Sequence, residues 1–243
     1  MNPSLLTHFS QDRCPNWVCP SCSATSLAIL PGTFHSSSQS KSLDTLTGCD
    51  GESEDIQQVF ICLLGCERSS CMAVVAASGT GYVCETPGEA REQGERAFFE
   101  LYQVRSFTPP LTAFNIPGQC PANVAQSLTY SFSLFLCAPG AAANAIRIAL
   151  EELMDALGVT EQRSLHRRIA SLPQQYRDYH DALMAIKFLG NAGSHELDRV
   201  TATDIEQAYT IIEFVLRKIY AGSTESVRQL VARIDERFRP VSR

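Results

Sequence analysis

The stretch HDALMAIKFLGNAGSHE, residues 180–196, carries the helical pattern from which the rest of the chain can be interpreted. Apolar side chains recur at helical spacing up to and through it, which predicts an amphipathic helix. They are Tyr176, Tyr179, Leu183 and Ile186. A second line on the same helix contains His180, Met184, Lys187, Asn191 and His195. Gly190 and Gly193 thin the side chains there, so the helix either frays or is approached closely by another backbone. A solvated helix end with a glycine stop is the alternative that the spacing allows.

Length and charge limit the possible classes of protein. A chain of 243 residues can bury a core as one large domain or two small ones. Residues 1–138 contain 6 Lys and Arg against 12 Asp and Glu, whereas residues 139–243 contain 14 of each class. Proteins that grip nucleic acid non-specifically need a basic surface, which this chain lacks globally. Arg163, Arg167 and Arg168 form its one local basic cluster, for which a solvated helix face is the alternative.

The first residues, MNPSLLTHFSQDR, show no basic region followed by an apolar stretch, so we expect no signal peptide. No apolar run reaches the length of a membrane span. We therefore expect a cytoplasmic protein with no membrane partner. In that compartment the ten cysteines do not predict a disulfide framework.

Two groups of cysteines flank a strand-forming segment: CPNWVCPSC at residues 14–22 and CLLGCERSSC at residues 62–71. Two close-spaced pairs in this arrangement resemble the knuckles of a zinc ribbon, in which four thiolates close a tetrahedral site. The predicted ligands of a structural Zn²⁺ are Cys19, Cys22, Cys66 and Cys71. The first pair is a clean CxxC, and the second pair lies in a polar, turn-like segment.

Other assignments of the cysteines stay open. Cys62 lies in the apolar run VFICLL, where a buried free thiol is common. Either Cys14 or Cys62 could replace one of the predicted ligands, because the step from Cys66 to Cys71 is five residues instead of three. Buried thiols, or a redox dithiol at CPSC, are the alternatives to a metal site.

The first part of the chain, residues 1–106, is predicted to be a small zinc-ribbon-like β module. Residues 32–55 are rich in Ser, Gly and acidic residues and are predicted to form a flexible insertion. The segments IQQVFICLL, CMAVVAAS and ERAFFELYQVRSF have the pattern of strands, and SGTGYVCET predicts a glycine turn with a short further strand. Residues 107–120, which are rich in proline, are predicted to form a linker.

From Pro121 to the end of the sequence, residues 121–243, the pattern is helical. Helices are predicted within residues 122–138, 141–158, 164–172, 174–196, 203–221 and 225–238. Thr203 with Glu206 has the spacing of a capping box at the start of the fifth helix. Six helices with short connections predict a bundle, so the expected class is α+β, a β module followed by an all-α bundle.

Three segments in this order identify a family resemblance: GAAANAIRIALEELMDALG (140–158), SLHRRIASLP (164–173) and IKFLGNAGSHE (186–196). Followed by a long amphipathic helix, they resemble the prokaryotic HEPN-like domain catalogued as domain of unknown function 4145. That family also resembles this chain in carrying a cysteine-knuckle module ahead of the helices. The most specific elements are the segment around Arg147 and Glu151 and the GN-x3-H motif of Gly190, Asn191 and His195.

The resemblance implies a helical domain that dimerises and occurs in phage-defence and toxin–antitoxin settings. Many relatives are metal-independent ribonucleases, whose motif is an arginine, then a polar residue, then a histidine four to six positions beyond the arginine. Asn191 and His195 match the last two, but Gly190 stands where the arginine would be. Cleavage through the 2′-hydroxyl needs a base, which His195 could supply, and a fixed cation, which Gly190 cannot.

Two hypotheses follow from the missing arginine. In the first, the chain is a non-catalytic HEPN-like binding or dimerisation protein, a homodimer that contacts RNA or a defence-system protein. Its candidate contacts are Arg147, Arg163, Arg167 and Arg168, although Arg147 and Glu151 also have the spacing of a simple surface ion pair. In the second, it is a ribonuclease whose candidate catalytic residues are His195, Asn191 and Lys187. Lysine is a poorer phosphate clamp than arginine, which favours the first hypothesis.

Overall fold

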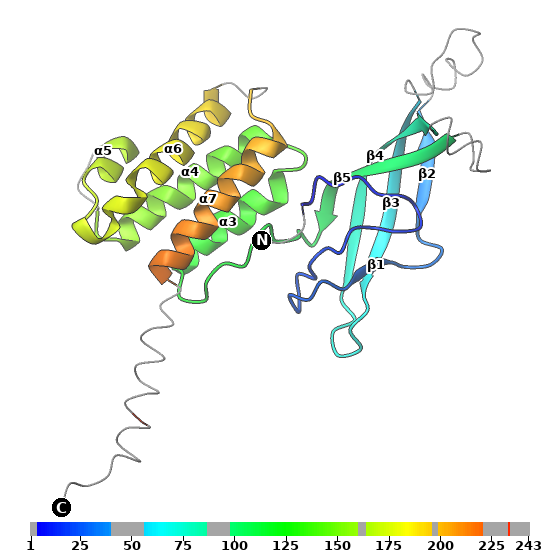
Figure 1. The fold of residues 1–243 in the computed structure, drawn as a ribbon, viewed down its shortest axis with the longest axis horizontal. Helices are drawn as coiled ribbons and strands as arrows, with labels where there is room; N and C mark the ends of the chain where they lie inside the picture. The colour runs from blue at the N-terminus through cyan, green and yellow to red at the C-terminus, as the bar shows by residue number, and fades with distance from the viewer. Residues whose placement is uncertain are drawn as a thin grey trace, which may run out of the picture.

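A computed structural model describes residues 4–39, 56–86, 98–159, 164–195, 199–220 and residue 233. Its first part is an antiparallel sheet that curls around a core, and its second part is a group of helices (Figure 1). The strands are β1 (Leu27–Ile29), β2 (His35–Ser38), β3 (Gln57–Cys66), β4 (Val74–Glu85) and β5 (Phe98–Thr108). Their order is β1-β3-β4-β5, and β2 also pairs with β3.

Strand β3 lies inside the sheet, because it pairs with β1, β2 and β4. Its side chains alternate between the core and solvent. Phe60, Cys62 and Leu64 face the core, where Phe60 stacks on Phe34. At the β5 edge of the sheet, Tyr102 exchanges backbone hydrogen bonds of 3.0 and 2.8 Å with Phe9 of the N-terminal segment. The strands expected from IQQVFICLL, CMAVVAAS and ERAFFELYQVRSF are therefore present as β3, β4 and β5.

The glycine turn predicted in SGTGYVCET is wrong, because β4 continues through it to Glu85. Gly79 and Gly81 serve a different purpose, which is the close approach of β5. A Cβ atom at Gly79 would lie 2.1 Å from the carbonyl oxygen of Gln103, and one at Gly81 would lie 2.5 Å from the Tyr102 ring. The register shifts between Ser78 and Gly79, so these glycines accompany a β-bulge.

The helices are α3 (Ala122–Leu134), α4 (Pro139–Ala156), α5 (Leu165–Ala170), the 3₁₀ helix η2 (Gln174–Tyr179), α6 (His180–His195) and α7 (Ala202–Tyr220). Helix α4 lies between α3 and α6, and α7 packs across them (Figure 1). Apolar residues on one face of α4, including Ile146, Leu150 and Leu153, are fully buried. The five earlier helices predicted from the sequence are thus present, whereas the one predicted at 225–238 lies outside the described residues, Arg233 excepted.

The capping box predicted at Thr203 and Glu206 is wrong, since α7 begins earlier. Thr201 donates its backbone N–H and its hydroxyl to the Asp204 carboxylate, and the Asp204 N–H donates back to the Thr201 hydroxyl. These bonds, from the Thr201 side chain first, lower the pKa of Asp204. Glu206 is consequently free to bind another part of the chain.

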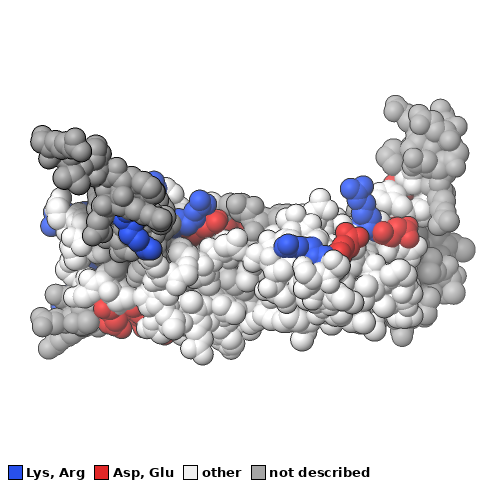
Figure 2. All heavy atoms as spheres, turned by 90° about the horizontal axis from the view of Figure 1, so that it is seen from below, with Lys and Arg blue, Asp and Glu red and all other residues white. Residues whose placement is uncertain are grey.

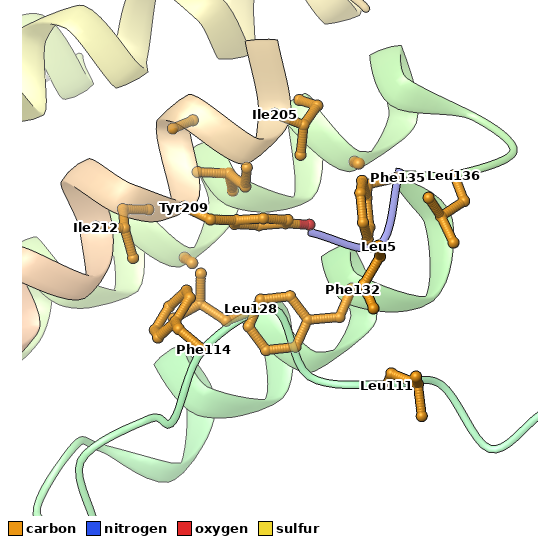
Figure 3. Packing of buried hydrophobic residues seen from close by; sticks show 14 of the residues in the cluster. Leu5, Leu111, Phe114, Leu128, Phe132, Phe135, Leu136, Ile205, Tyr209 and Ile212 are labelled. Carbon is orange, nitrogen blue, oxygen red and sulfur yellow. The ribbon is translucent and has the colours of Figure 1, made fainter. Parts of the chain in front are cut away.

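The N-terminal strap, residues 4–9, joins the sheet to the helices. Glu206 of α7 accepts hydrogen bonds from the Ser4 hydroxyl at 2.8 Å and from the Leu5 N–H at 3.2 Å. Leu5 is buried in the helical core together with Leu111 and Phe114 from the connecting segment (Figure 3). None of the described helices has the length and apolar content needed to cross a membrane.

Candidate metal centre

The four predicted ligands, Cys19, Cys22, Cys66 and Cys71, lie together at one end of the sheet. Their sulfur atoms are all within 4.8 Å of one another. The Cys19 and Cys71 sulfurs are 3.8 Å apart, and those of Cys22 and Cys66 are 3.7 Å apart. Four sulfurs placed tetrahedrally at about 2.3 Å from a Zn²⁺ ion would be about 3.8 Å apart. The cluster therefore has the dimensions of a four-thiolate metal site.

The first knuckle is a tight loop between Val18 and Thr25, which form an isolated β-bridge. The Cys19 N–H donates to the carbonyl of Ala24 at 2.8 Å, and the Ser23 N–H donates to the carbonyl of Cys19 at 2.9 Å. Ser23 has a φ of 57°, a left-handed conformation that non-glycine residues rarely adopt. It turns the chain sharply after Cys22, and the sulfurs of Cys19 and Cys22 both lie in the four-sulfur cluster.

The second knuckle is the connection from β3 to β4. It has the same hydrogen bond across its base and the same left-handed turn, but two more residues between its cysteines. The Cys66 N–H donates to the carbonyl of Ala73 at 2.8 Å, and the N–H groups of Cys71 and Met72 both donate to the backbone carbonyl of Arg68. Met72 has a φ of 51° and follows Cys71 as Ser23 follows Cys22. The five-residue step from Cys66 to Cys71 therefore widens the loop while the turn after its second cysteine keeps the same form.

Hydrogen bonds, burial and the neighbouring thiols together set the pKa values of Cys66 and Cys71. The Ser26 hydroxyl lies 3.1 Å from the Cys66 sulfur. This hydrogen bond, with the Arg68 amide, lowers the pKa of Cys66 to about 7. The Ala73 amide lowers the pKa of Cys71, but burial and the neighbouring thiols outweigh it and raise that pKa to about 12. Four thiols this close ionise together only when a cation lies between them, which is the chemistry of a metal site.

The structure places Cys14 and Cys62 outside the four-sulfur cluster. Cys14 is buried with its sulfur 3.5 Å from the carbonyl oxygen of Leu27. Burial raises the pKa of Cys14, and it raises that of Cys62 to about 11. Neither sulfur belongs to the group of four that lies within 4.8 Å, so neither cysteine replaces a predicted ligand.

The glycines of the GN-x3-H motif are buried between two helices. A Cβ at Gly190 would lie 2.6 Å from Cβ of Arg147 on α4, and one at Gly193 would lie 2.5 Å from the carbonyl oxygen of Gly140. The sequence allowed either a frayed helix or the close approach of another backbone at these glycines. The structure shows the close approach. Asn191 and Lys187 are half-buried on α6, and the Lys187 ammonium lies 4.3 Å from the centre of the Phe188 ring. His195 is the last residue of α6, and its side chain is not among those described.

Two of the candidate arginines are engaged within the helical part. Arg147 donates from Nη1 to Glu151 at 2.5 Å and from Nε to Asn144 at 3.2 Å. Arg168 donates to Asp155 and to the carbonyl of Val159. Arg167 is exposed on α5, and Arg163 lies outside the described residues. The positive charge of the basic cluster predicted from the sequence is therefore reduced, because Asp155 pairs with Arg168.

Comparison with known families divides the chain into two matched parts. Residues 131–237 match the model of a family described as a domain of unknown function (DUF4145). Residues 7–110 match that of a second domain of unknown function (DUF8608). No curated protein and no solved structure matches the chain. The helical and sheet parts are thus each similar to an uncharacterised domain.

Proposed function

We propose that this chain is a non-catalytic, HEPN-like binding and dimerisation protein whose sheet is organised by a structural zinc ion. Four cysteine sulfurs within 4.8 Å of one another suit Zn²⁺ better than harder ions, which prefer oxygen ligands. Four protein ligands also leave no open position for a substrate or a reactive water. The metal would stabilise the sheet, and the binding surface would lie elsewhere.

The contact of Gly190 with Arg147 is the observation that carries the non-catalytic proposal. With a Cβ at position 190 only 2.6 Å from Cβ of Arg147, the helix contact has no room for an arginine there. Arg147 on α4 is an alternative cation, but Glu151 already accepts its hydrogen bond. A ribonuclease of the HEPN type needs a fixed cation beside its polar residue and histidine. The packing here favours recognition over turnover.

Exposed aromatic side chains on the helices support the dimerisation and partner proposals. Tyr130, Phe188 and Phe214 are 61, 56 and 54% exposed, and apolar groups of this size are commonly buried on association. In the sheet-bearing half, Figure 2 shows the charged side chains gathered in one band, with uncharged surface beside it. On the described part of this face, basic and acidic side chains alternate along the band, so this face offers no basic surface for nucleic acid. A homodimer that contacts RNA or a defence-system protein in a prokaryotic cytoplasm is the proposed setting.

Dimerisation has a direct test. Light scattering of the purified chain at tens of micromolar should give twice the monomer mass. A monomer mass at that concentration would contradict the dimer, leaving the metal site as a separate question.

The alternative function is a metal-independent ribonuclease using His195, with Asn191 and Lys187 on the same helix. The deciding experiment incubates total RNA with wild type, with His195→Ala and with His166→Ala, an exposed histidine of α5. We expect the same uncleaved RNA in all three, and weaker RNA or partner binding for His195→Ala. Cleavage by wild type and His166→Ala that disappears in His195→Ala would establish the ribonuclease.

A further inference from the structure

A cavity of about 200 Å³ lies where the N-terminal strap meets α7, and none of the four clustered cysteines lines it. Its floor is apolar and consists of Leu5, Phe114 and Tyr209, each at most 4% exposed. These three side chains belong to the core cluster in Figure 3. One wall is a polar stripe of α7 that includes Glu206 and Glu213, and Ser4 and Ala113 line the other side. An apolar floor with a few polar groups at a junction between two parts of a fold is typical of a small-molecule site.

Glu213 is the least satisfied charged group of this wall. Its side chain is only 14% exposed, and among the described residues its ion-pair partner is Arg217, at 3.8 Å across one helical turn. That separation is beyond hydrogen-bond distance, and the Arg217 side chain is itself 66% exposed. A carboxylate that is mostly shielded from water and has only a distant cation gains from a closer donor, so a cationic ligand in the cavity would stabilise it.

Glu206 supplies a second carboxylate on the same face. It is seven residues from Glu213, which is two turns or about 10 Å along the helix axis. Both of its oxygens face the strap, where the Ser4 hydroxyl donates to Oε1 at 2.8 Å and to Oε2 at 3.1 Å. Oε2 has only this one long bond among the described residues, so it retains capacity to accept another donor.

We propose that this cavity binds a short alkyl diamine, with one ammonium group on Glu213, the other on Glu206 and the alkyl chain over the apolar floor. Two carboxylates separated by two helical turns suit a ligand with a positive charge at each end. A six-atom ligand such as 1,4-diaminobutane, with a hydrogen bond of about 2.8 Å at each end, spans about 10 Å, the separation of the two glutamates along the helix axis. Tyr209 and Phe114 favour the methylene groups over a hydrated metal ion.

Binding here would also tie the two parts of the chain together. The Ser4 carbonyl accepts a hydrogen bond from Trp17 at 3.4 Å, and Trp17 packs against Phe107 at the end of β5. A ligand that bridges Glu206 and Glu213 therefore rests on the segment that connects α7 to the sheet. This inference does not depend on the proposed function, because none of its residues belongs to the cysteine cluster or the GN-x3-H helix.

Calorimetric titration of the full chain with 1,4-diaminobutane at low ionic strength tests the site. We expect one binding event per chain, at least tenfold weaker affinity for 1-aminobutane, and none for 1,4-butanediol. Glu213→Gln should weaken diamine binding at least tenfold. Asp178→Asn is the matched control, since it removes an exposed carboxylate elsewhere in the helical part and should bind as wild type does.

A second variant separates ligand binding from folding. Ala113→Leu adds bulk to the wall opposite α7 and should block the diamine, with circular dichroism confirming that the helices are intact. Wild-type protein that does not bind the diamine would overturn the proposal, and so would equal binding by wild type and Glu213→Gln. Magnesium chloride that displaces the diamine at matched ionic strength would show only a general attraction of cations, and it too would overturn the proposal.

Discussion

In the sheet, two loops far apart in the sequence bring four sulfur atoms within 4.8 Å, whereas in the helices two glycines bring two backbones into contact. The first arrangement is unstable on its own, because four thiolates repel one another until a cation joins them. The second is stable without any ligand, because it depends on the absence of side chains. The sheet should therefore be destabilised by removing a cysteine that binds the metal, whereas the helices should be destabilised by adding a side chain at a glycine.

The largest expected effect is loss of the metal. Purified wild-type protein should carry about one zinc ion per chain, and Cys19→Ser should lose it and unfold the sheet. Structural zinc sites contribute several kcal/mol or more to folding, so near-ultraviolet circular dichroism of Trp17, which is fully buried beside the cluster, should collapse. The helical far-ultraviolet signal should persist.

The control for this change is Cys137→Ser, an exposed cysteine outside the cluster, which should retain both metal and fold. Full metal content in a Cys19→Ser, Cys22→Ser double variant would contradict the ligand assignment. Loss of helical signal together with the sheet would show that the strap contact between Ser4 and Glu206 couples the two parts more strongly than we expect.

The next effect is the addition of a side chain at Gly190. Gly190→Arg restores the arginine of the ribonuclease motif, but its Cβ would lie 2.6 Å from Cβ of Arg147 and 3.1 Å from the carbonyl oxygen of Ala143. We expect the free energy of unfolding to fall by more than about 2 kcal/mol, with no RNA cleavage gained. Urea unfolding measures the first quantity.

The matched control is Gly118→Arg, where an added Cβ would meet nothing within 4 Å. Its stability should change by less than about 0.5 kcal/mol. A stable, RNA-cleaving Gly190→Arg protein would reverse our interpretation of the helix contact, and the ribonuclease hypothesis would then be favoured.

The contrast also explains what could be predicted from the sequence. The four cysteines could be predicted because only certain residue types bind such a metal, and two loops joined by paired strands must bring them together. The approximate position of α4 followed from its apolar spacing, whereas residues 174–179, predicted as the start of the helix that contains α6, form the separate 3₁₀ helix η2. Whether Gly190 opened a cleft or received a neighbour could not be predicted, since spacing along one helix contains no information about which helix packs on it.

Other features of the site had weak signals or none. Ser26 is close to Cys22 in sequence, but its bond to Cys66 depends on the pairing of β1 with β3. Ser23 and Met72 occupy left-handed positions where glycine would be the usual residue, so their identities gave no sign of the turn. The glycines of β4 were misinterpreted as a turn because close approach of β5 is a tertiary property.

A smaller effect is expected from the hydroxyl group behind Cys66. Ser26→Ala removes a donor 3.1 Å from that sulfur and leaves the four ligands in place. Partners of this kind typically change metal affinity by 10- to 100-fold, and we expect about tenfold weaker zinc binding in competition with a chelator. Ser21→Ala, in the same knuckle but not bonded to a ligand sulfur among the described residues, is the control. Equal affinity in both variants would mean that the Ser26 hydroxyl has no role in the site.

The smallest effect has the opposite sign, because it relieves the backbone where the second knuckle turns. Met72 has a φ of 51° and is 75% exposed, so its side chain contributes little packing to offset the conformation. A left-handed non-glycine residue costs about 1–2 kcal/mol. Glycine removes that cost but loses about 0.5–1 kcal/mol through the freer unfolded chain. Met72→Gly should therefore stabilise the metal-bound sheet by about 0.5–1 kcal/mol in urea unfolding. Met72→Ala keeps the Cβ and loses the same side chain, so it should gain nothing. If alanine stabilises as much as glycine, the gain comes from removing an exposed methionine and not from relieving the left-handed backbone. The positive φ at Met72 would then cost no measurable free energy.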